Sequence, residues 1–357
     1  MTQHSTSAPK QTLLNLSDAE GSIVLPRQVM HQALESVLPM SSLPDRSRYD
    51  TLRSHIANHY GLDPLNTFLG NGSDDLIENI ARLYSRGPVL VVSPTFGRLS
   101  SVNTKVGLSQ EDVKHFYLSP ENDFEYDDAT HQRLLANICT LEPSVLWLCT
   151  PNNPTGTLIS PRYVVELSEL MPEGKVVVDQ VFLDFLGNAA DYSCVELVKN
   201  QDNIIVINSF SKAKGLAGLR LGFGFGNKNC AQELSSMMLY YALSTPAVEL
   251  GIETIRSAHQ SIQVQLTKLR RNRETVLSTV GSIPNLHYVA NSSTNLMCLK
   301  LLHSADIYDK LARQGVLTKD LSRTDGMENQ GYVRVRIPSN HSDMVALIAA
   351  IEAAAAT

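Results

Sequence analysis

Short apolar runs alternate with amphipathic segments over the first two thirds of the 357-residue chain. Runs rich in Val, Ile and Leu occupy 89–92, 145–149, 176–178, 204–207 and, after a glycine-rich turn, 219–225. Helical periodicity occupies 52–60, 75–84 and 163–170. Strands that are apolar on both faces are typical of a mostly parallel sheet covered by helices. We therefore expect a large α/β domain.

The last third of the chain has a different pattern. The segment 234–279 is predicted to be helical, and strand-like segments at 294–301 and 332–337 then alternate with helical ones at 305–314 and 344–355. This pattern indicates a smaller α+β domain. We divide the chain into a disordered tail, an arm that joins the small domain, a large domain and a small domain, at 1–12, 13–45, 46–245 and 246–357.

Composition narrows the possible classes of protein. Hydrophobic residues make up 43% and charged residues 18%, which suits an ordinary folded protein. The net charge of −6 gives no sign of a nucleic-acid surface. Five scattered cysteines without a CxxC pair argue against a disulfide framework or a zinc site. The first residues lack an apolar signal-peptide core, and no run is long enough to cross a bilayer, so we expect a cytoplasmic protein without a metal, membrane or nucleic-acid partner.

Lys212 is the first candidate for chemistry. It follows an apolar run, has Ser209 and Ser211 beside it, and precedes Arg220 by eight residues across a glycine-bracketed turn. A lysine amine can form a Schiff base with an aldehyde cofactor, and hydroxyls with an arginine can hold a phosphate on it. Exposed lysines after strands are common, so the spacing alone leaves an ordinary surface lysine open.

Three other segments combine candidate chemistry with a structural alternative. Asp179 ends an apolar run and could pair with a protonated pyridine nitrogen, or could simply cap a turn. Asn153 lies in a proline-rich loop and could donate to a phenolate oxygen, or could belong to a plain turn. Ser73 and Asp74 open a helix after Gly72, where backbone N–H groups bind phosphate, but the same residues also make good helix caps.

Taken in order, six segments carry a family resemblance: GNGSDD, PTF, TPNNPTG, VVVDQVF, SFSKAKGLAGLRLGF and YYALSTP. The chain resembles the pyridoxal-phosphate enzymes of fold type I from about 49 to 334, and among them the histidinol-phosphate aminotransferase group. The resemblance implies a homodimer with active sites at the interface. It also implies transfer of an amino group between histidinol phosphate, or a related amine or amino acid, and an oxo acid such as 2-oxoglutarate.

The resemblance implies a role for each matching residue. Lys212 would form the Schiff base and carry a proton to and from the substrate, and Asp179 would pair with the pyridine nitrogen. The substrate α-carboxylate, or its equivalent, would bind Arg334, with Tyr241 and Lys319 as further substrate contacts. The remaining cofactor contacts would be Ser73, Asp74, Phe96, Asn153, Phe182, Ser209, Ser211, Arg220 and, from the neighbouring subunit, Tyr49.

The chain departs from this group at four places. Phe182 stands where a tyrosine usually donates to the phenolic oxygen, and a phenylalanine there also resembles threonine-phosphate decarboxylase. Gln180 and Val181 replace a usual Glu-Ala pair, and the segment 18–21, Asp-Ala-Glu-Gly, stands where Asn-Glu-Asn-Pro is usual. Lys319 replaces an arginine that binds the substrate phosphate, and a lysine offers a point charge instead of a fork.

These departures keep other functions open. A pyridoxal-phosphate-dependent amino-acid decarboxylase, or an amino-acid oxidase of specialised metabolism, would fit the same scaffold. A non-catalytic protein that retained the fold is a third alternative. The combination of Lys212, Asp179, Asn153 and Arg220 argues against that alternative, because together they form a complete cofactor site.

Overall fold

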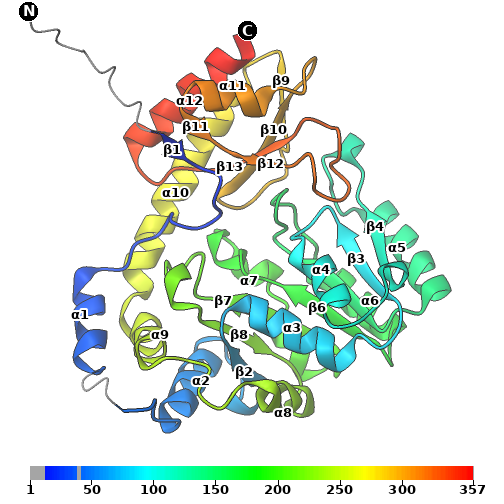
Figure 1. Ribbon diagram of the computed structural model, residues 1–357, viewed down its shortest axis with the longest axis vertical. Helices are drawn as coiled ribbons and strands as arrows, with labels where there is room; N and C mark the ends of the chain where they lie inside the picture. The colour runs from blue at the N-terminus through cyan, green and yellow to red at the C-terminus, as the bar shows by residue number, and fades with distance from the viewer. Residues whose placement is uncertain (1–12, 38–41, 357) are drawn as a thin grey trace, which may run out of the picture.

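The computed structural model describes residues 13–37 and 42–356, so the predicted disordered tail at 1–12 lies outside the described residues. A seven-stranded sheet forms the centre of the larger part of the molecule, and a four-stranded sheet lies above it in Figure 1. Helices cover both faces of the larger sheet. This arrangement confirms the expected α/β fold with a smaller α+β part.

The larger sheet is mostly parallel. Its strands lie in the order β2 (Thr67–Gly70), β8 (Gly222–Phe225), β7 (Ile204–Ser209), β6 (Lys175–Asp179), β5 (Val145–Cys149), β3 (Val89–Ser93) and β4 (Val113–Tyr117). Only β8 runs antiparallel to its neighbours. The strand predicted at 219–225 begins later, at Gly222, because a 3-10 turn occupies Ala217–Leu219 and Arg220 has a left-handed backbone with φ of 53°.

Alternate residues of the buried strands enter two separate cores. In β5, Trp147 packs under α3 (Ser73–Tyr84), α4 (Arg98–Lys105) and α8 (Lys228–Met237). Leu146 and Leu148 of the same strand face α5 (Asp128–Leu141) and α6 (Pro161–Leu170). Because neighbouring side chains of a strand point to opposite faces, a fully apolar run requires helices on both sides.

The smaller sheet is antiparallel, in the order β12 (Lys319–Asp320), β13 (Val333–Arg336), β10 (Leu296–Leu301) and β9 (Leu286–Tyr288). Three helices lie with it: α10 (His259–Val280), α11 (Ile307–Arg313) and α12 (His341–Ala356). Within the described ranges no helix is long and apolar enough to cross a membrane.

The segment 234–279, which was predicted to be helical, contains parts of three helices with breaks between them. Helix α8 ends at Met237 and α9 (Thr245–Ser257) begins only after an irregular segment. Ser244 caps α9 by accepting a hydrogen bond from the Ala247 amide, and Pro246 follows in the first turn. Proline has no N–H to extend a preceding helix, so the chain restarts here.

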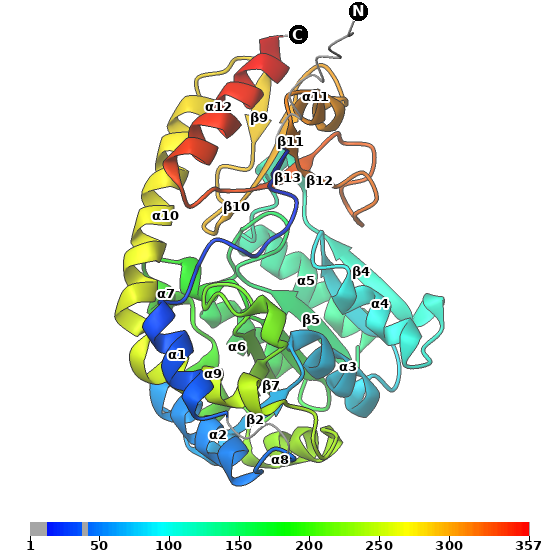
Figure 2. The ribbon, with the colours of Figure 1, turned by 60° about the vertical axis from the view of Figure 1, so that its left-hand side comes forward.

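The N-terminal segment links the two parts of the molecule. β1 (Leu14–Asn15) pairs in parallel with β11 (Val316–Leu317) beside the smaller sheet. The chain then descends to α1 (Arg27–Glu35), which packs on α9, as Figure 2 illustrates. Helix α9 also packs on α2 (Ser47–His59), and α7 (Ala189–Tyr192) is a single turn near the larger sheet. We call residues 14–24 the N-terminal strap; the predicted domain boundaries stay predictions.

A buried ion pair fixes the loop that follows β7. The amine of Lys214, whose side chain is 8% exposed, contacts the Asp184 carboxylate and lies 3.5 Å from the Tyr60 hydroxyl. Burial alone would lower the pKa of Lys214, but Asp184 and Tyr60 outweigh it and raise that pKa. Burial raises the pKa of Tyr60 to about 12. The pair therefore ties the loop after β7 to the loop after β6.

We expect Lys214→Met to lower the free energy of unfolding by about 3 kcal/mol, because it leaves Asp184 without its partner in a largely buried place. Chemical denaturation followed by circular dichroism measures this loss. Lys228→Met is the matched control, since the Lys228–Asp63 pair is exposed. Its denaturation midpoint should not move, and equal losses in both variants would contradict a special role for the buried pair.

Candidate active site

The sequence-predicted cofactor residues converge at the carboxyl edge of the parallel strands. The loops after β5, β6 and β7 bring Asn153, Asp179 and Lys212 there, and the start of α3 faces them. A cavity of about 100 Å³ lies between these segments. The predicted residues that line it are Ser73, Asp74, Phe96, Asn153, Asp179, Phe182, Ser211, Lys212 and Arg220. Ligands bind at this edge in open α/β sheets.

Asp179 supplies a buried carboxylate at the end of β6. Its side chain is 4% exposed, and its Oδ1 accepts a hydrogen bond of 3.0 Å from the Val181 amide. Burial raises the pKa of Asp179 to about 6, and the positive charge of Lys212 only partly opposes this. A carboxylate with so little compensation is stabilised by a cation that binds beside it. A protonated pyridine nitrogen is such a cation, so this residue fits the cofactor.

Asn153 and Arg334 hold each other in one orientation. The Oδ1 of Asn153 accepts a hydrogen bond of 2.7 Å from Arg334 Nη1, which leaves the amide NH₂ of Asn153 as a donor at the cavity. Arg334 Nη2 donates to the carbonyl of Ser17, and its buried Nε has no hydrogen-bond partner among the described residues. An arginine held in this way, with a donor left over, can bind a carboxylate.

The start of α3 forms an anion-binding cradle. Its first N–H groups, at Ser73 and Asp74, have no partner within the helix. A Cβ at Gly222 would lie 2.4 Å from the carbonyl carbon of Gly72, so strand β8 passes directly against this turn. Arg220 Nη2 lies 2.9 Å from the Asp74 carboxylate, beside the same turn. Free N–H groups and a guanidinium are suited to a phosphate.

Two predicted cofactor residues lie outside this cavity. Ser209 is buried, and its Oγ accepts a hydrogen bond of 2.8 Å from the Ser211 amide, so it shapes the loop. The hydroxyl of Tyr49 donates to the carbonyl of Leu243 at 2.6 Å, and Tyr49 lines a separate cavity near α9. Its predicted place is the site of a neighbouring subunit, which a single chain does not contain.

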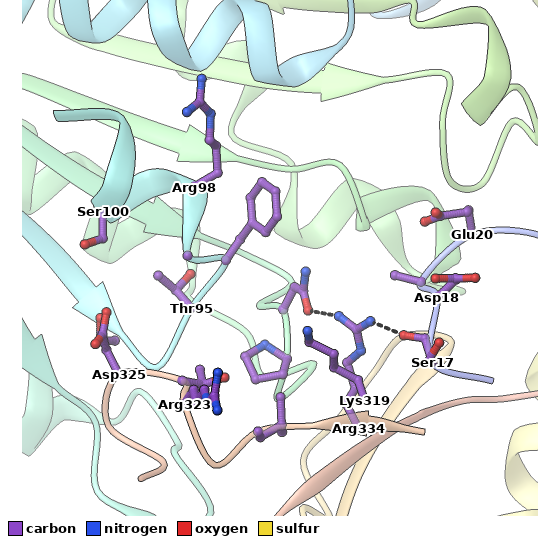
Figure 3. Close-up of a pocket in the computed structure, with 18 of the residues that line it drawn as sticks. Ser17, Asp18, Glu20, Thr95, Arg98, Ser100, Lys319, Arg323, Asp325 and Arg334 are labelled. Carbon is purple, nitrogen blue, oxygen red and sulfur yellow. Dashed lines mark hydrogen bonds between the residues drawn. The ribbon is translucent and has the colours of Figure 1, made fainter. Parts of the chain in front are cut away.

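A larger cavity of about 620 Å³ adjoins the cofactor cavity and shares Glu20, Phe96, Asn153 and Lys212 with it. Figure 3 shows Arg334 and Lys319 close together in it, with Arg323 and Asp325 farther along the wall. Two of the predicted substrate residues, Arg334 and Lys319, therefore lie here. The third, Tyr241, is 44% exposed in the turn between α8 and α9 and lines neither cavity.

Sequence reasoning missed four residues that line the cofactor cavity: Glu20, Cys149, Val181 and Ala217. Burial beside Asp179 raises the pKa of the Cys149 thiol well above its usual value. Glu20 belongs to the segment 18–21, which departs from the sequence usual in the resembling group. That departure was the one feature of the sequence that could have pointed to Glu20. No group of three His, Cys, Asp or Glu side chains in the described part of the chain could hold a metal ion.

The site as a whole defines the class of protein. It contains an amine, a buried carboxylate, an amide donor and an anion cradle around one cavity, which together fit pyridoxal phosphate. Residues 14–352 match the family model of aminotransferases of class I and II, and the chain belongs to that family. It is a pyridoxal-phosphate-dependent aminotransferase of fold type I.

Relatives and solved structures agree with this placement. The chain is 27% identical to the histidinol-phosphate aminotransferase of Thermoanaerobacter pseudethanolicus over 319 residues, covering 88% of this chain and 86% of that protein. The structure resembles histidinol-phosphate aminotransferase from Clostridium acetobutylicum, with a TM-score of 0.86, 20% identity, and coverage of 96% and 99%. It also resembles the Sinorhizobium meliloti enzyme in complex with pyridoxal-5'-phosphate, with a TM-score of 0.82, 19% identity, and coverage of 97% and 91%. L-threonine-O-3-phosphate decarboxylase from Porphyromonas gingivalis has a TM-score of 0.78 at 20% identity, with coverage of 95% and 98%.

We expect Asp179→Asn to stabilise the cofactor-free protein above pH 6. The raised pKa means that the folded protein binds more protons than the unfolded chain between about pH 4 and 6, so stability falls as pH rises through that window. The wild type should lose at most roughly 3 kcal/mol of its free energy of unfolding across this window, and Asp179→Asn should not lose it. Thermal melts across this pH range measure the difference.

The exposed Asp309→Asn is the control for this experiment and should keep the wild-type pH profile. Bound pyridoxal phosphate should make the wild type more stable than Asp179→Asn, because its protonated nitrogen would pair with the aspartate but not with an asparagine. A variant that kept the wild-type pH profile would contradict the unfavourable burial of Asp179.

Proposed function

We propose that the chain transfers an amino group between histidinol phosphate, or a related amine or amino acid, and an oxo acid such as 2-oxoglutarate. Lys212 is the lysine that joins the cofactor. One observation carries the proposal: the Lys212 amine and the Asp179 carboxylate line one cavity, which the phosphate cradle borders and which opens toward Arg334.

Each side chain has a distinct part in this reaction. Pyridoxal phosphate, when bound, withdraws electrons from the substrate carbon that loses its proton. Asp179 would hold the proton on the pyridine nitrogen, and Asn153 would donate to the phenolic oxygen. Arg334 would bind and orient the substrate, and the Lys212 amine would take up the proton that the substrate carbon loses.

The larger cavity supports a substrate with an anionic group far from its amine. Lys319 and Arg323 line this cavity. Neither side chain makes a hydrogen bond or ion pair with another residue in the described ranges. The relatives that match over most of the chain act on histidinol phosphate according to their names. A phosphate seated between these two cations is consistent with both observations.

Phe182 supports decarboxylation as the second candidate reaction. Its ring is 3% exposed, lines the cofactor cavity and lies 5.7 Å from the Lys212 amine, where it offers no hydroxyl group. A solved decarboxylase of phosphothreonine shares the fold. Release of carbon dioxide without an oxo product would favour this reaction over transamination.

A homodimer is the proposed working unit. Leu239, Tyr240 and Tyr241 form an exposed apolar turn, with Leu239 79% exposed. Tyr49 lies near this segment and away from its own subunit's cofactor cavity. A second copy that covers the turn would bring Tyr49 and Tyr241 toward the neighbouring site. The expected cytoplasmic location stays a prediction.

We expect histidinol phosphate, added to the purified protein without an oxo acid, to remove the visible absorption band of the lysine-bound cofactor. One equivalent of carbonyl product per site should appear. Lys212→Ala should lack the band and lose turnover by at least a thousandfold, because no amine replaces Lys212, whereas Lys228→Ala should behave as wild type. Substantial transamination by pure Lys212→Ala protein would contradict the assignment.

Lys319→Ala should raise KM for histidinol phosphate roughly tenfold, the effect of losing one charge-assisted contact. The kcat value should change little, and KM for an amine without a phosphate should stay constant. Steady-state kinetics with both amines measure this. An unchanged KM for histidinol phosphate would place its phosphate elsewhere.

A further inference from the structure

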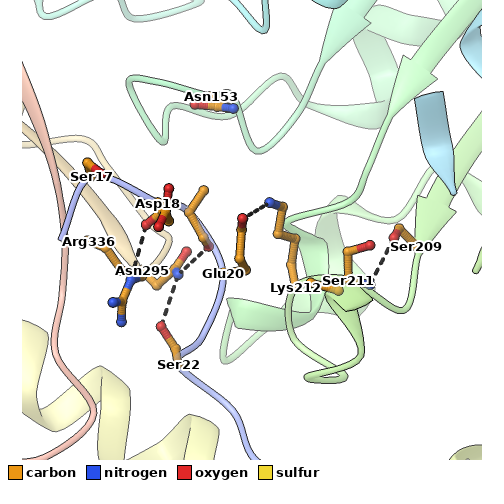
Figure 4. Close-up of polar contacts among 12 residues, drawn as sticks. Ser17, Asp18, Glu20, Ser22, Asn153, Ser209, Ser211, Lys212, Asn295 and Arg336 are labelled. Atoms are coloured by element: carbon orange, nitrogen blue, oxygen red, sulfur yellow. Dashed lines mark hydrogen bonds and ion pairs between the residues drawn. The ribbon is translucent and has the colours of Figure 1, made fainter. Parts of the chain in front are cut away.

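The polar partner of the Lys212 amine comes from the N-terminal strap. Lys212 Nζ lies 2.5 Å from Oε2 of Glu20, a residue 192 positions earlier in the chain, as Figure 4 shows. Glu20 lines both the cofactor cavity and the larger cavity. It therefore lies where the two cavities join, which is where a substrate amine has to approach the cofactor.

The strap is held in place on both sides of Glu20. Asn295 Nδ2 donates to the carbonyl of Ala19 at 3.1 Å, which fixes the strap to the smaller sheet. The side-chain amide of Gln265 on α10 both accepts from the Val24 N–H, at 2.9 Å, and donates to the Val24 carbonyl, at 2.7 Å. These contacts fix the backbone on both sides of Glu20 and therefore define the position of the Glu20 carboxylate.

Other groups around the amine do not replace this carboxylate. The Phe182 ring lies 5.7 Å from Lys212 Nζ and has no hydrogen-bonding group. The charged side chains that line the cofactor cavity from other elements are Asp179 on β6 and Asp74 on α3, which pairs with Arg220. Arg334 on β13 lies in the adjoining cavity. Burial raises the pKa of Glu20, but the hydrogen bond and charge of Lys212, together with Arg334, lower it overall. Glu20 is therefore ionised at neutral pH.

We propose that Glu20 is a further proton-handling residue of the active site, and that it controls the protonation of Lys212. The inference rests on Lys212 being the lysine that joins the cofactor. To join an aldehyde cofactor, the Lys212 amine would first have to lose a proton. Glu20 would accept that proton: an N–H bond of Nζ breaks, an O–H bond forms on Oε2, and the electron pair stays on nitrogen.

The same carboxylate acts on the loaded enzyme through its charge. With the cofactor bound, this negative charge would lie close to the Lys212 nitrogen and would favour the protonated form of that nitrogen. Glu20 thus acts electrostatically on the Lys212 nitrogen, whereas the apolar side chain of Phe182 has no charge or hydrogen-bonding group to do so. A substrate ammonium that enters from the larger cavity meets Glu20 and can give its proton to the same oxygen.

The first test is a pH titration of the visible absorption band of the cofactor-loaded enzyme. Glu20→Gln keeps the size of the side chain and removes its charge, so the midpoint should fall by about one pH unit or more. Asp18→Asn removes a charge from the same strap, but the Asp18 carboxylate accepts its hydrogen bond from the Asn15 amide, so the midpoint should move by at most a few tenths of a unit. Equal shifts in the two variants would overturn the proposal.

The second test uses the cofactor-free protein. The rate constant for binding of pyridoxal phosphate, followed by stopped-flow absorption, should lie below that of the wild type across the pH profile in Glu20→Gln, because the glutamine cannot accept the proton that Lys212 gives up. Glu20→Asp keeps the charge at a greater distance and should give an intermediate profile. It also serves as the test variant if Glu20→Gln does not fold. Wild-type profiles in both variants would overturn the proposal.

These outcomes are separable from failure of the proposed function. If Lys212→Ala kept the visible band, the assignment of Lys212 itself would be wrong. If Lys212→Ala lost the band while Glu20→Gln titrated as wild type, only the role of Glu20 would be wrong.

Discussion

The burial of the Asp179 carboxylate is the constraint on which the rest of the site depends. Its position at the end of β6 removes it from water, and a single backbone N–H from Val181 compensates only part of the cost. A cation beside it would offset the rest of that cost, and the cofactor's pyridine nitrogen is the cation that we propose. Because β5, β6 and β7 are parallel neighbours, the groups that contact the rest of the cofactor leave the sheet at the same edge.

The smaller part of the molecule completes the site from the opposite side. Arg334 on β13 orients Asn153, which belongs to the loop after β5, and the N-terminal strap places Glu20 on Lys212. These contacts therefore join the predicted substrate residue Arg334 to the predicted cofactor residue Asn153, and the strap to Lys212. Two lysines two residues apart have separate tasks: Lys214 is neutralised by a structural ion pair, and Lys212 faces the cavity.

Much of the larger sheet could be predicted from apolar runs. The run at 145–149 has the same limits as β5. A strand covered on both faces is apolar at every position, so the apolar run begins and ends where the strand does. The edge strands β2 and β4 were missed. Strand β4 contains Lys114 and His115, since one side of an edge strand faces solvent, and β2 has only four residues. The break between α8 and α9 depends on local capping by Ser244, which the helical periodicity did not reveal.

The sequence by itself determined the class of cofactor, because Lys212, Asp179 and Asn153 each lie at or just after the end of a buried strand, in short segments whose order along the chain is specific. Only the tertiary structure decided which groups surround the amine. Glu20 and Lys212 are 192 residues apart, and nothing in local periodicity records a contact across that distance. The hydrogen bond between Arg334 and Asn153 likewise exists only because the smaller sheet packs over the carboxyl edge of the larger one. The residue types that carry the chemistry can be identified from short segments, whereas the electrostatic environment of a reactive group depends on every element that packs against it.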